Sequence, residues 1–400
     1  MIRATRTQWI KFAVVLALYL IFLVWLRSWL GLVVVPFIFD AYITKKIPWT
    51  WWRESKNRHV VTVMGWVDAI VFALVAVYFV NLYFFQNYVI PSSSLEKSLL
   101  TGDYLFVSKM SYGPRVPQTP LHMPLAQHTL PFFNCKSYLE HPQWDYKRVK
   151  GLGDVQLNDI VVFNFPAGDT VATGVPNDDI YRLSYGAGKE LAKPVDLASM
   201  TPEQQRVVYD YYYQLGREYL KENPQNFGEI ISRPVDRREN YVKRCVGLPG
   251  QTLEIKDRII YLDGKANKEP DNVQYRYLVK TKRPIPDDLA HELGISKEDM
   301  MMYYTDASVY NMPLTEKAKA GLLARKDIVV SIENTPADDA GGLYPLNMYK
   351  NWTTDNYGPV WIPKKGETVK LTIENLPVYE RPIHVYEGNE LAGEEGKNYF

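Results

Sequence analysis

Two long apolar segments near the start of the chain constrain its fold more than any other feature. Every residue from 12 to 26 is apolar or aromatic, and after a two-residue break the apolar character resumes over residues 29–39. As a single helix, residues 12–39 would be about 42 Å long, which exceeds the roughly 30 Å hydrocarbon core of a bilayer. We therefore expect a tilted or kinked transmembrane helix here.

A cleavable signal peptide is the competing interpretation of the first segment. Arg3, Arg6 and Lys11 form a basic region before it, as in a secretory signal. The apolar run is longer than a signal peptide requires, and no A-x-A cleavage site follows it. These two observations favour a signal anchor that stays in the membrane.

A second apolar segment runs from residue 60 to 85 and is cleanest over residues 69–80, so the sequence predicts two transmembrane spans. The loop between the spans carries more basic than acidic residues. By the positive-inside rule this loop stays in the cytoplasm, and the chain after residue 85 lies outside. The basic N-terminus argues the other way, which leaves open a hairpin-like first segment whose N-terminus is also cytoplasmic. The charged residues of the loop are Lys45, Lys46, Arg53, Lys56 and Arg58 against Asp40 and Glu54.

The chain beyond the membrane anchor is predicted to be mainly β. Short segments rich in β-branched and aromatic residues alternate with Gly, Pro and Asp. Two helices interrupt them, one capped by Thr201 and Gln204 and ending near residue 223, the other starting after Thr315 and ending near residue 324. We therefore divide the chain into a membrane anchor, residues 1–90, and an extracytoplasmic domain, residues 91–400. The predicted strands are 104–109, 159–165, 240–246, 252–255 and 258–262.

Composition and charge exclude several classes of function. The 46 basic and 45 acidic residues nearly cancel, so we expect no nucleic-acid partner. Two cysteines, Cys135 and Cys245, cannot form a four-ligand zinc site or a disulfide scaffold and are expected to be free thiols. The histidines at 122, 128 and 141 lack the spacing of metal ligands, and we expect neither a metal nor a cofactor.

A cluster of serines follows the second span directly, in the segment IPSSSL at residues 90–95. Pro91 fixes its own backbone and holds Ile90 extended, so the serines lie on a constrained turn at the bilayer surface. From this segment alone a flexible stalk is the favoured interpretation, because Ser and Pro are common in loops. A catalytic serine would need a general base.

Lys243 is the candidate base. In the predicted strand 240–246, alternation places Tyr241, Lys243 and Cys245 on one face, which makes the lysine a candidate for burial. Burial disfavours the ammonium and lowers the pKa of a lysine towards the range of a general base. The pattern alone favours a solvated lysine on an edge strand, where lysine is common.

Three ordered motifs resemble those of bacterial type I signal peptidases, also called leader peptidases. Residues 88–95 (YVIPSSSL) and 99–109 (LLTGDYLFVSK) look like the family's first signature, I-P-S-x-S-M-x-P-T-L followed by G-D and an apolar strand. Residues 158–163 (NDIVVF) are similar to its G-D-I-V-V-F strand, and residues 241–250 (YVKRCVGLPG) to its lysine signature Y-I-K-R-V-x-G-L-P-G-D. The resemblance covers about residues 60 to 265.

The resemblance implies a membrane-bound serine endopeptidase that removes N-terminal signal peptides from exported preproteins with a Ser/Lys dyad. It would act on the extracytoplasmic side of the bacterial cytoplasmic (inner) membrane, with preprotein signal peptides and the lipid bilayer as partners. The implied fold is a β-rich signal-peptidase-like catalytic domain with insertions near 169–238 and 265–349. The implied site comprises Ser94 as nucleophile, neutral Lys243 as base, the Ser94 N–H and Ser92 hydroxyl as oxyanion donors, Tyr88, Ile90, Leu99 and Val242 in the substrate pockets, and Arg244 in a structural role.

The sequence departs from the family pattern at two places. Leu95 replaces the family's Met, and Glu-Lys-Ser at residues 96–98 stands where x-P-T is expected. The last signature, G-D-N followed by N-S-x-D-S-R, is absent, which is consistent with a truncated reading of a longer chain. Two alternatives therefore stay open: a catalytically silent membrane-anchored homologue that acts as a binding or scaffold protein, and another Ser/Lys hydrolase such as the self-cleaving SOS repressors, against which the two spans argue.

Overall fold

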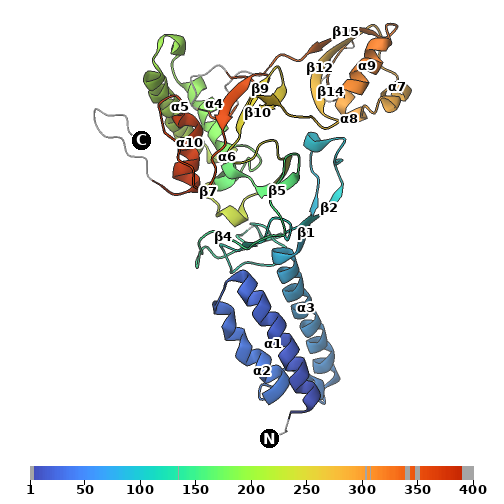
Figure 1. The fold of residues 1–400 in the computed structure, drawn as a ribbon, viewed down its shortest axis with the longest axis vertical. Helices are drawn as coiled ribbons and strands as arrows, with labels where there is room; N and C mark the ends of the chain where they lie inside the picture. Colours follow the sequence, from blue (N-terminus) through green and yellow to red (C-terminus); the bar gives the residue numbers. More distant parts are fainter. Residues whose placement is uncertain are drawn as a thin grey trace.

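The protein is described by a computed structural model that covers residues 4–133, 135–301, 304–306, 308–337, 343–346 and 352–389. An apolar helical base carries a body of small sheets, and a separate sheet with its own helices lies at the far end (Figure 1). The N-terminus lies at the free end of the helical base (Figure 1).

The first apolar segment forms a helical hairpin, so the single tilted or kinked span predicted from the sequence is wrong. Helix α1 (Arg6–Leu26) ends because Arg27 adopts a left-handed conformation with φ of 50°. The chain then returns along α1 through a 3-10 turn (Leu30–Val34), α2 (Val35–Phe39) and a π turn (Asp40–Thr44). The ring of Phe39 packs edge-on against that of Phe12 at 5.4 Å.

The hairpin brings both basic regions to one end of the helical base. A 3-10 turn (Trp51–Glu54) follows the returning arm, and helix α3 (Arg58–Tyr83) then runs back up to the body. By length and composition α1 and α3 can each cross a membrane. The N-terminus and the loop before α3 therefore lie at the same end of the helices (Figure 1). This is the hairpin alternative that the sequence left open.

The body consists of antiparallel pairs that confirm the predicted strands. Strand β1 (Phe85–Val89) pairs with β2 (Tyr104–Ser108), and β5 (Ile160–Asn164) pairs with β8 (Asn240–Arg244). A four-stranded sheet has the order β11-β10-β9-β16. Its strands are β9 (Thr252–Lys256), β10 (Ile259–Leu262), β11 (Lys265–Ala266) and β16 (Tyr357–Trp361), and two shorter pairs join β3 (Arg115–Val116) to β4 (Lys147–Arg148) and β6 (Thr170–Ala172) to β7 (Ile230–Ser232).

The first predicted insertion is a helical hairpin. Helix α4 (Ile180–Leu191) packs along α5 (Pro202–Glu222), and α6 (Pro224–Phe227) follows. The predicted capping box is present, because Thr201 and Gln204 accept each other's backbone N–H groups. Further along the chain, α10 (Leu376–Arg381) and a π turn (Pro382–Tyr386) reach this region, where Arg206 pairs with Glu380 at 2.5 Å.

The second insertion contains a folded unit with a sheet of its own. Its sheet has the order β13-β14-β12-β15, built from β12 (Gln274–Thr281), β13 (Tyr304–Asp306), β14 (Val309–Thr315) and β15 (Val329–Asn334). Helices α7 (Asp287–Glu292), α8 (Lys297–Met301) and α9 (Glu316–Ala324) accompany it, and Thr315 caps α9 as predicted. Val279, Met312, Leu322 and Ile328 are fully buried in its core.

The close approach of α4 to α5 yields a test of the fold. A Cβ at Gly188 would lie 1.8 Å from the carbonyl oxygen of Tyr212, whereas a Cβ at Gly186 in the same helix would meet nothing within 4 Å. Gly188→Ala should therefore destabilise the protein by about 1–3 kcal/mol through overpacking. The control Gly186→Ala should be neutral or stabilise by up to about 1 kcal/mol. Thermal unfolding of the full chain in detergent measures both, and equal effects would contradict the packing.

Candidate active site

The turn that carries the serines is closed at its base by the β1–β2 hairpin. The backbone N–H of Ile90 donates to the Asp103 carbonyl at 3.0 Å, and the N–H of Gly102 donates to the Ile90 carbonyl at 2.9 Å. Ile90 is 3% exposed, and the Asp103 carboxylate accepts the N–H of Leu100 at 2.8 Å. These contacts hold the loop between Ile90 and Gly102 in one place relative to the hairpin.

The structure brings Ser94 and Lys243 together. Ser94 lies in a 3-10 turn (Ser93–Leu95), and the Lys243 Nζ donates to the Ser94 Oγ at 2.6 Å. The Ser92 Oγ lies 3.5 Å from the Ser94 Oγ. The first N–H groups of a helical turn have no partner within it, so the Ser94 N–H and the Ser92 hydroxyl are suited to stabilise a developing oxyanion.

The antiparallel β5–β8 pair positions the lysine. Lys243 lies opposite Val161 and Val242 lies opposite Val162 in this register. The next residue, Arg244, donates through Nη1 to the carbonyl of Asn158 and through Nη2 to the Ser98 Oγ, each at 2.9 Å. Arg244 thus fastens the serine-bearing loop to the strand that holds the lysine.

Lys243 is exposed in this structure, which confirms the solvated edge-strand lysine that the pattern alone favours and does not bear out the candidate burial. The reason is that β8 pairs only with β5 among the described strands, which leaves the lysine stem uncovered. Partial desolvation of the ammonium where it meets the catalytic turn nevertheless lowers the pKa of Lys243 below its ordinary value. The direction is the one that a general base requires.

The four residues predicted to line substrate pockets differ in their exposure to solvent. Of the four, only Tyr88 lines the cavity beside the hairpin, and burial raises the pKa of its hydroxyl to about 12. Ile90 is buried, whereas Leu99 and Val242 are half-buried. The side chains of Tyr88 and Ile90 are therefore packed into the body and leave little surface for a substrate to contact.

Acidic residues of the second insertion approach the catalytic turn, which the sequence did not indicate. Partial burial raises the pKa of the Glu96 carboxyl, Lys97 opposes the shift, and the carboxylates of Asp299 and Glu298 on α8 add repulsion. Figure 1 shows α8 close to the tip of the β1–β2 hairpin. Pattern reasoning missed this contact because it joins residues about two hundred positions apart.

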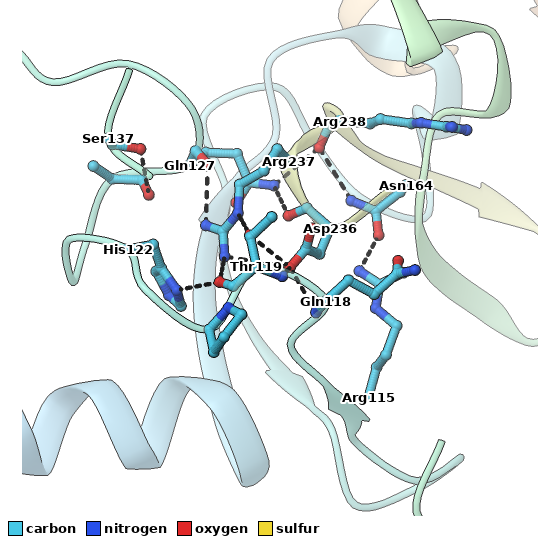
Figure 2. Close-up of polar contacts among 12 residues, drawn as sticks. Arg115, Gln118, Thr119, His122, Gln127, Ser137, Asn164, Asp236, Arg237 and Arg238 are labelled. Carbon is cyan, nitrogen blue, oxygen red and sulfur yellow. Dashed lines mark hydrogen bonds and ion pairs between the residues drawn. The ribbon is translucent and has the colours of Figure 1, made fainter. Parts of the chain in front are cut away.

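A polar network next to β8 was also missed (Figure 2). One oxygen of Asp236 accepts the N–H groups of Gln118 and Thr119 and the Thr119 hydroxyl, all at 3.0 Å. Arg237 donates through Nε to the same hydroxyl at 2.6 Å. The network ties the loop of residues 113–150 to the start of the catalytic strand. The only sequence signal was the charge run DRRE at residues 236–239.

Two histidines of the 113–150 loop make polar contacts near this network. The Nε2 of His128 lies 2.9 Å from the Glu239 carboxylate, and the Nδ1 of His122 lies 3.0 Å from the Thr119 carbonyl. Within the described part of the chain, no group of three or more metal-ligating side chains occurs. Cys135 and Cys245 are free thiols.

Comparison with known proteins identifies the family of this chain. The family model "Signal peptidase, peptidase S26" matches residues 63–303, more than half of the chain. Signal peptidase I P of Bacillus subtilis subsp. natto is 20% identical over 69% of this chain and 90% of the relative, and signal peptidase I of Helicobacter pylori is 42% identical over 14% of this chain and 18% of the relative. Signal peptidase I of Rickettsia prowazekii is 24% identical over 38% of this chain and 56% of the relative. No solved structure matches significantly.

A serine hydroxyl bonded to a lysine amine, on a turn held by paired strands, defines a candidate hydrolase of the Ser/Lys type. The family match makes the class specific. The chain belongs to the peptidase S26 family of signal peptidases, which places it among the serine endopeptidases.

Proposed function

We propose that this protein is a membrane-anchored signal peptidase that cuts signal peptides from exported preproteins with Ser94 and Lys243. The observation that carries the proposal is the 2.6 Å contact between the Lys243 Nζ and the Ser94 Oγ, on motifs that match the family. Ser94 and Lys243 are 149 positions apart, so the fold rather than chain proximity makes this contact.

In the acylation step, neutral Lys243 accepts the proton of the Ser94 hydroxyl as the Oγ attacks the carbonyl carbon of the scissile bond. The Ser94 N–H and the Ser92 hydroxyl stabilise the negative charge that develops on the carbonyl oxygen. The Lys243 ammonium then donates its proton to the leaving amine, and the peptide C–N bond breaks. The signal peptide remains as an ester on Ser94.

In the deacylation step, Lys243 is again neutral and accepts a proton from a water molecule that attacks the ester. The same two donors hold the second oxyanion, and the proton returns to the Ser94 Oγ as the ester bond breaks. The products are the mature chain with a new amine, released in the first step, and the signal peptide with a new carboxylate.

The position of the dyad supports a substrate that emerges from the bilayer. Helix α3 ends at Tyr83 and β1 begins at Phe85, so the catalytic hairpin continues directly from an apolar helix that can cross a membrane. Signal peptides present their cleavage site at that level. We place the body on the extracytoplasmic side, because the basic residues cluster at the opposite end of the helices.

Removing either member of the dyad should abolish preprotein cleavage. Ser94→Ala and Lys243→Ala should each lower kcat by at least about a hundredfold to ten-thousandfold, because the nucleophile or its base is lost. Lys243→Arg should not rescue, since a guanidinium stays charged. Ser93→Ala, which alters the neighbouring hydroxyl, is the matched control and should stay active. Substantial cleavage by purified Ser94→Ala would contradict the assignment of Ser94 as the nucleophile. If the parent chain itself is inactive, the catalytically silent homologue becomes the better interpretation.

The pH dependence of cleavage should report the deprotonation of Lys243. Because the neutral amine is the active form, log(kcat/KM) should rise with pH and level off above the pKa of Lys243. Desolvation lowers that pKa, so the plateau should begin below about pH 10.4, the value of an unperturbed lysine. The profile of kcat/KM reports the pKa of the free enzyme, so substrate binding does not affect it. A flat profile between pH 6 and 9 would therefore contradict a lysine base.

Topology can be tested with a protease added to intact spheroplasts. The exposed α4–α5 hairpin should be cut, whereas the basic loop at residues 45–58 should be spared. Cleavage of both after lysis is the control for access. Cutting of residues 45–58 in intact spheroplasts would reverse the proposed orientation and separate the dyad from translocated substrates.

A further inference from the structure

A cavity of about 920 Å³ lies beside the catalytic hairpin, at its junction with the membrane helix. Val77, Tyr78 and Leu82 of α3 form part of its wall. The β1–β2 hairpin, the 113–127 loop, Arg148, strand β5 and the start of β8 also line it. Ser94 and Lys243 do not line it. The cavity is therefore distinct from the dyad, although Tyr88 borders its upper end.

The cavity has an excess of positive charge. Lys109, Arg115, Arg148 and Arg237 line it, together with two acidic residues, Asp236 and Glu239. Both carboxylates already have a cationic partner: Asp236 pairs with Arg237 at 3.4 Å, and Glu239 pairs with Arg233 at 3.2 Å. Within the described part of the chain, no ion pair is formed by Lys109, Arg115 or Arg148.

The three free cations are held close to one another by the backbone. Arg115 and Arg148 lie directly opposite each other in the β3–β4 pair, and like charges in that position are destabilising. Burial, together with repulsion from Arg115 and Arg148, lowers the pKa of Lys109 to about 8. At neutral pH the lysine is still mostly charged, so an anion between these groups would offset their mutual repulsion and the desolvation of Lys109 and Arg115.

The two arginines are also pre-oriented. Arg115 donates through Nη2 to the Asn164 side chain at 2.5 Å. Arg148 donates through Nη1 to the Gly113 carbonyl at 2.8 Å and through Nε to the Tyr146 hydroxyl at 2.9 Å. Each guanidinium has further N–H groups that can donate to a ligand. Paired guanidinium N–H groups are well suited to bind the oxygens of a phosphate.

The surroundings of the cavity match a lipid rather than a free anion. The loop of residues 113–150 rests on the ends of α1 and α3, where the Trp25 indole donates to the Lys150 carbonyl at 3.3 Å and the Tyr78 hydroxyl donates to the Pro120 carbonyl at 3.3 Å. Leu125, which lines the cavity, is 74% exposed, and the neighbouring Leu121 and Met123 are also exposed. Cationic side chains inside an apolar rim suit a phosphate headgroup with attached acyl chains.

We propose that this cavity binds the phosphate of an anionic glycerophospholipid, with Lys109, Arg115 and Arg148 as the groups that hold it. The acyl chains would lie along α3 and the exposed leucines of the loop. The inference rests on the membrane anchoring proposed above but does not depend on the chemistry of the dyad.

Calorimetry on the full chain in neutral maltoside micelles tests the site. Dihexanoyl phosphatidylglycerol, used below its micellar concentration, should bind saturably at one site. Combining Lys109→Gln with Arg148→Gln should weaken that binding at least about tenfold, the loss expected for charge-assisted hydrogen bonds. Lys150→Gln, which removes one positive charge from the same loop outside the cavity and so matches Arg148→Gln in charge, should leave binding within about twofold. An unchanged double variant would overturn the proposal.

Further measurements test which kind of molecule supplies the phosphate and whether the variants remain folded. Inorganic phosphate and dihexanoyl phosphatidylcholine should each bind at least about tenfold more weakly than phosphatidylglycerol, and equal binding of either would overturn the assignment to an anionic lipid. Arg148→Gln alone, at the exposed rim, guards against misfolding of the double variant and should weaken binding with an unchanged unfolding temperature. Ser94→Ala should bind lipid as the parent does, so a failure of the lipid site and a failure of the cleavage proposal are distinguishable.

Discussion

The direct junction between α3 and β1 is the constraint on which the geometry of the site depends. Only Phe84 separates the two elements, and its N–H still donates to the Val80 carbonyl at 2.9 Å while its carbonyl accepts the N–H of Lys109 at 2.8 Å. The helix end is therefore hydrogen-bonded into the hairpin that carries the serine turn. The register of the hairpin fixes the distance of Ser94 from the end of α3. The rest of the body has to place Lys243 next to that position.

The lysine reaches the serine through long-range contacts that leave it exposed. The β5–β8 register sets the direction of Lys243, and Arg244 fastens the strand to the serine loop, but no further strand covers the amine in the described part of the chain. A more deeply buried amine would have a lower pKa and would be neutral more often at pH 7. A substrate that lay across the turn would exclude water from the Lys243 amine and the Ser94 hydroxyl, and this would lower the pKa of the lysine further.

Local features of the fold could be predicted from the sequence, whereas its long-range contacts could not. The capping box at Thr201 and the cap at Thr315 involve neighbours three positions apart, and both were identified correctly. The reversal at Arg27 was not, because an apolar run looks the same in one helix or in two antiparallel ones. In β14, Tyr310, Met312 and Leu314 alternate inwards, but Pro313 between them disguised a strand. The pattern alone favoured a stalk for Ser94 and a solvated edge lysine for Lys243. The exposure of Lys243 agrees with the second of these, and the candidate burial could not be judged from the pattern because it depends on which elements cover β8.

The inserted segments differ in how strongly they are coupled to the site. The α4–α5 hairpin leaves and rejoins the body through the paired strands β6 and β7, and the second folded unit is closed by the pairing of Tyr277 with Asn334. Each has its own buried cluster, so either can vary without altering the β5–β8 register. The 113–150 loop is different, since Asp236 and Arg237 bind it to the approach of β8 while Val149 packs against Leu26 and Tyr83 of the anchor. This loop therefore connects helices α1 and α3 to the approach of β8, the strand that carries Lys243.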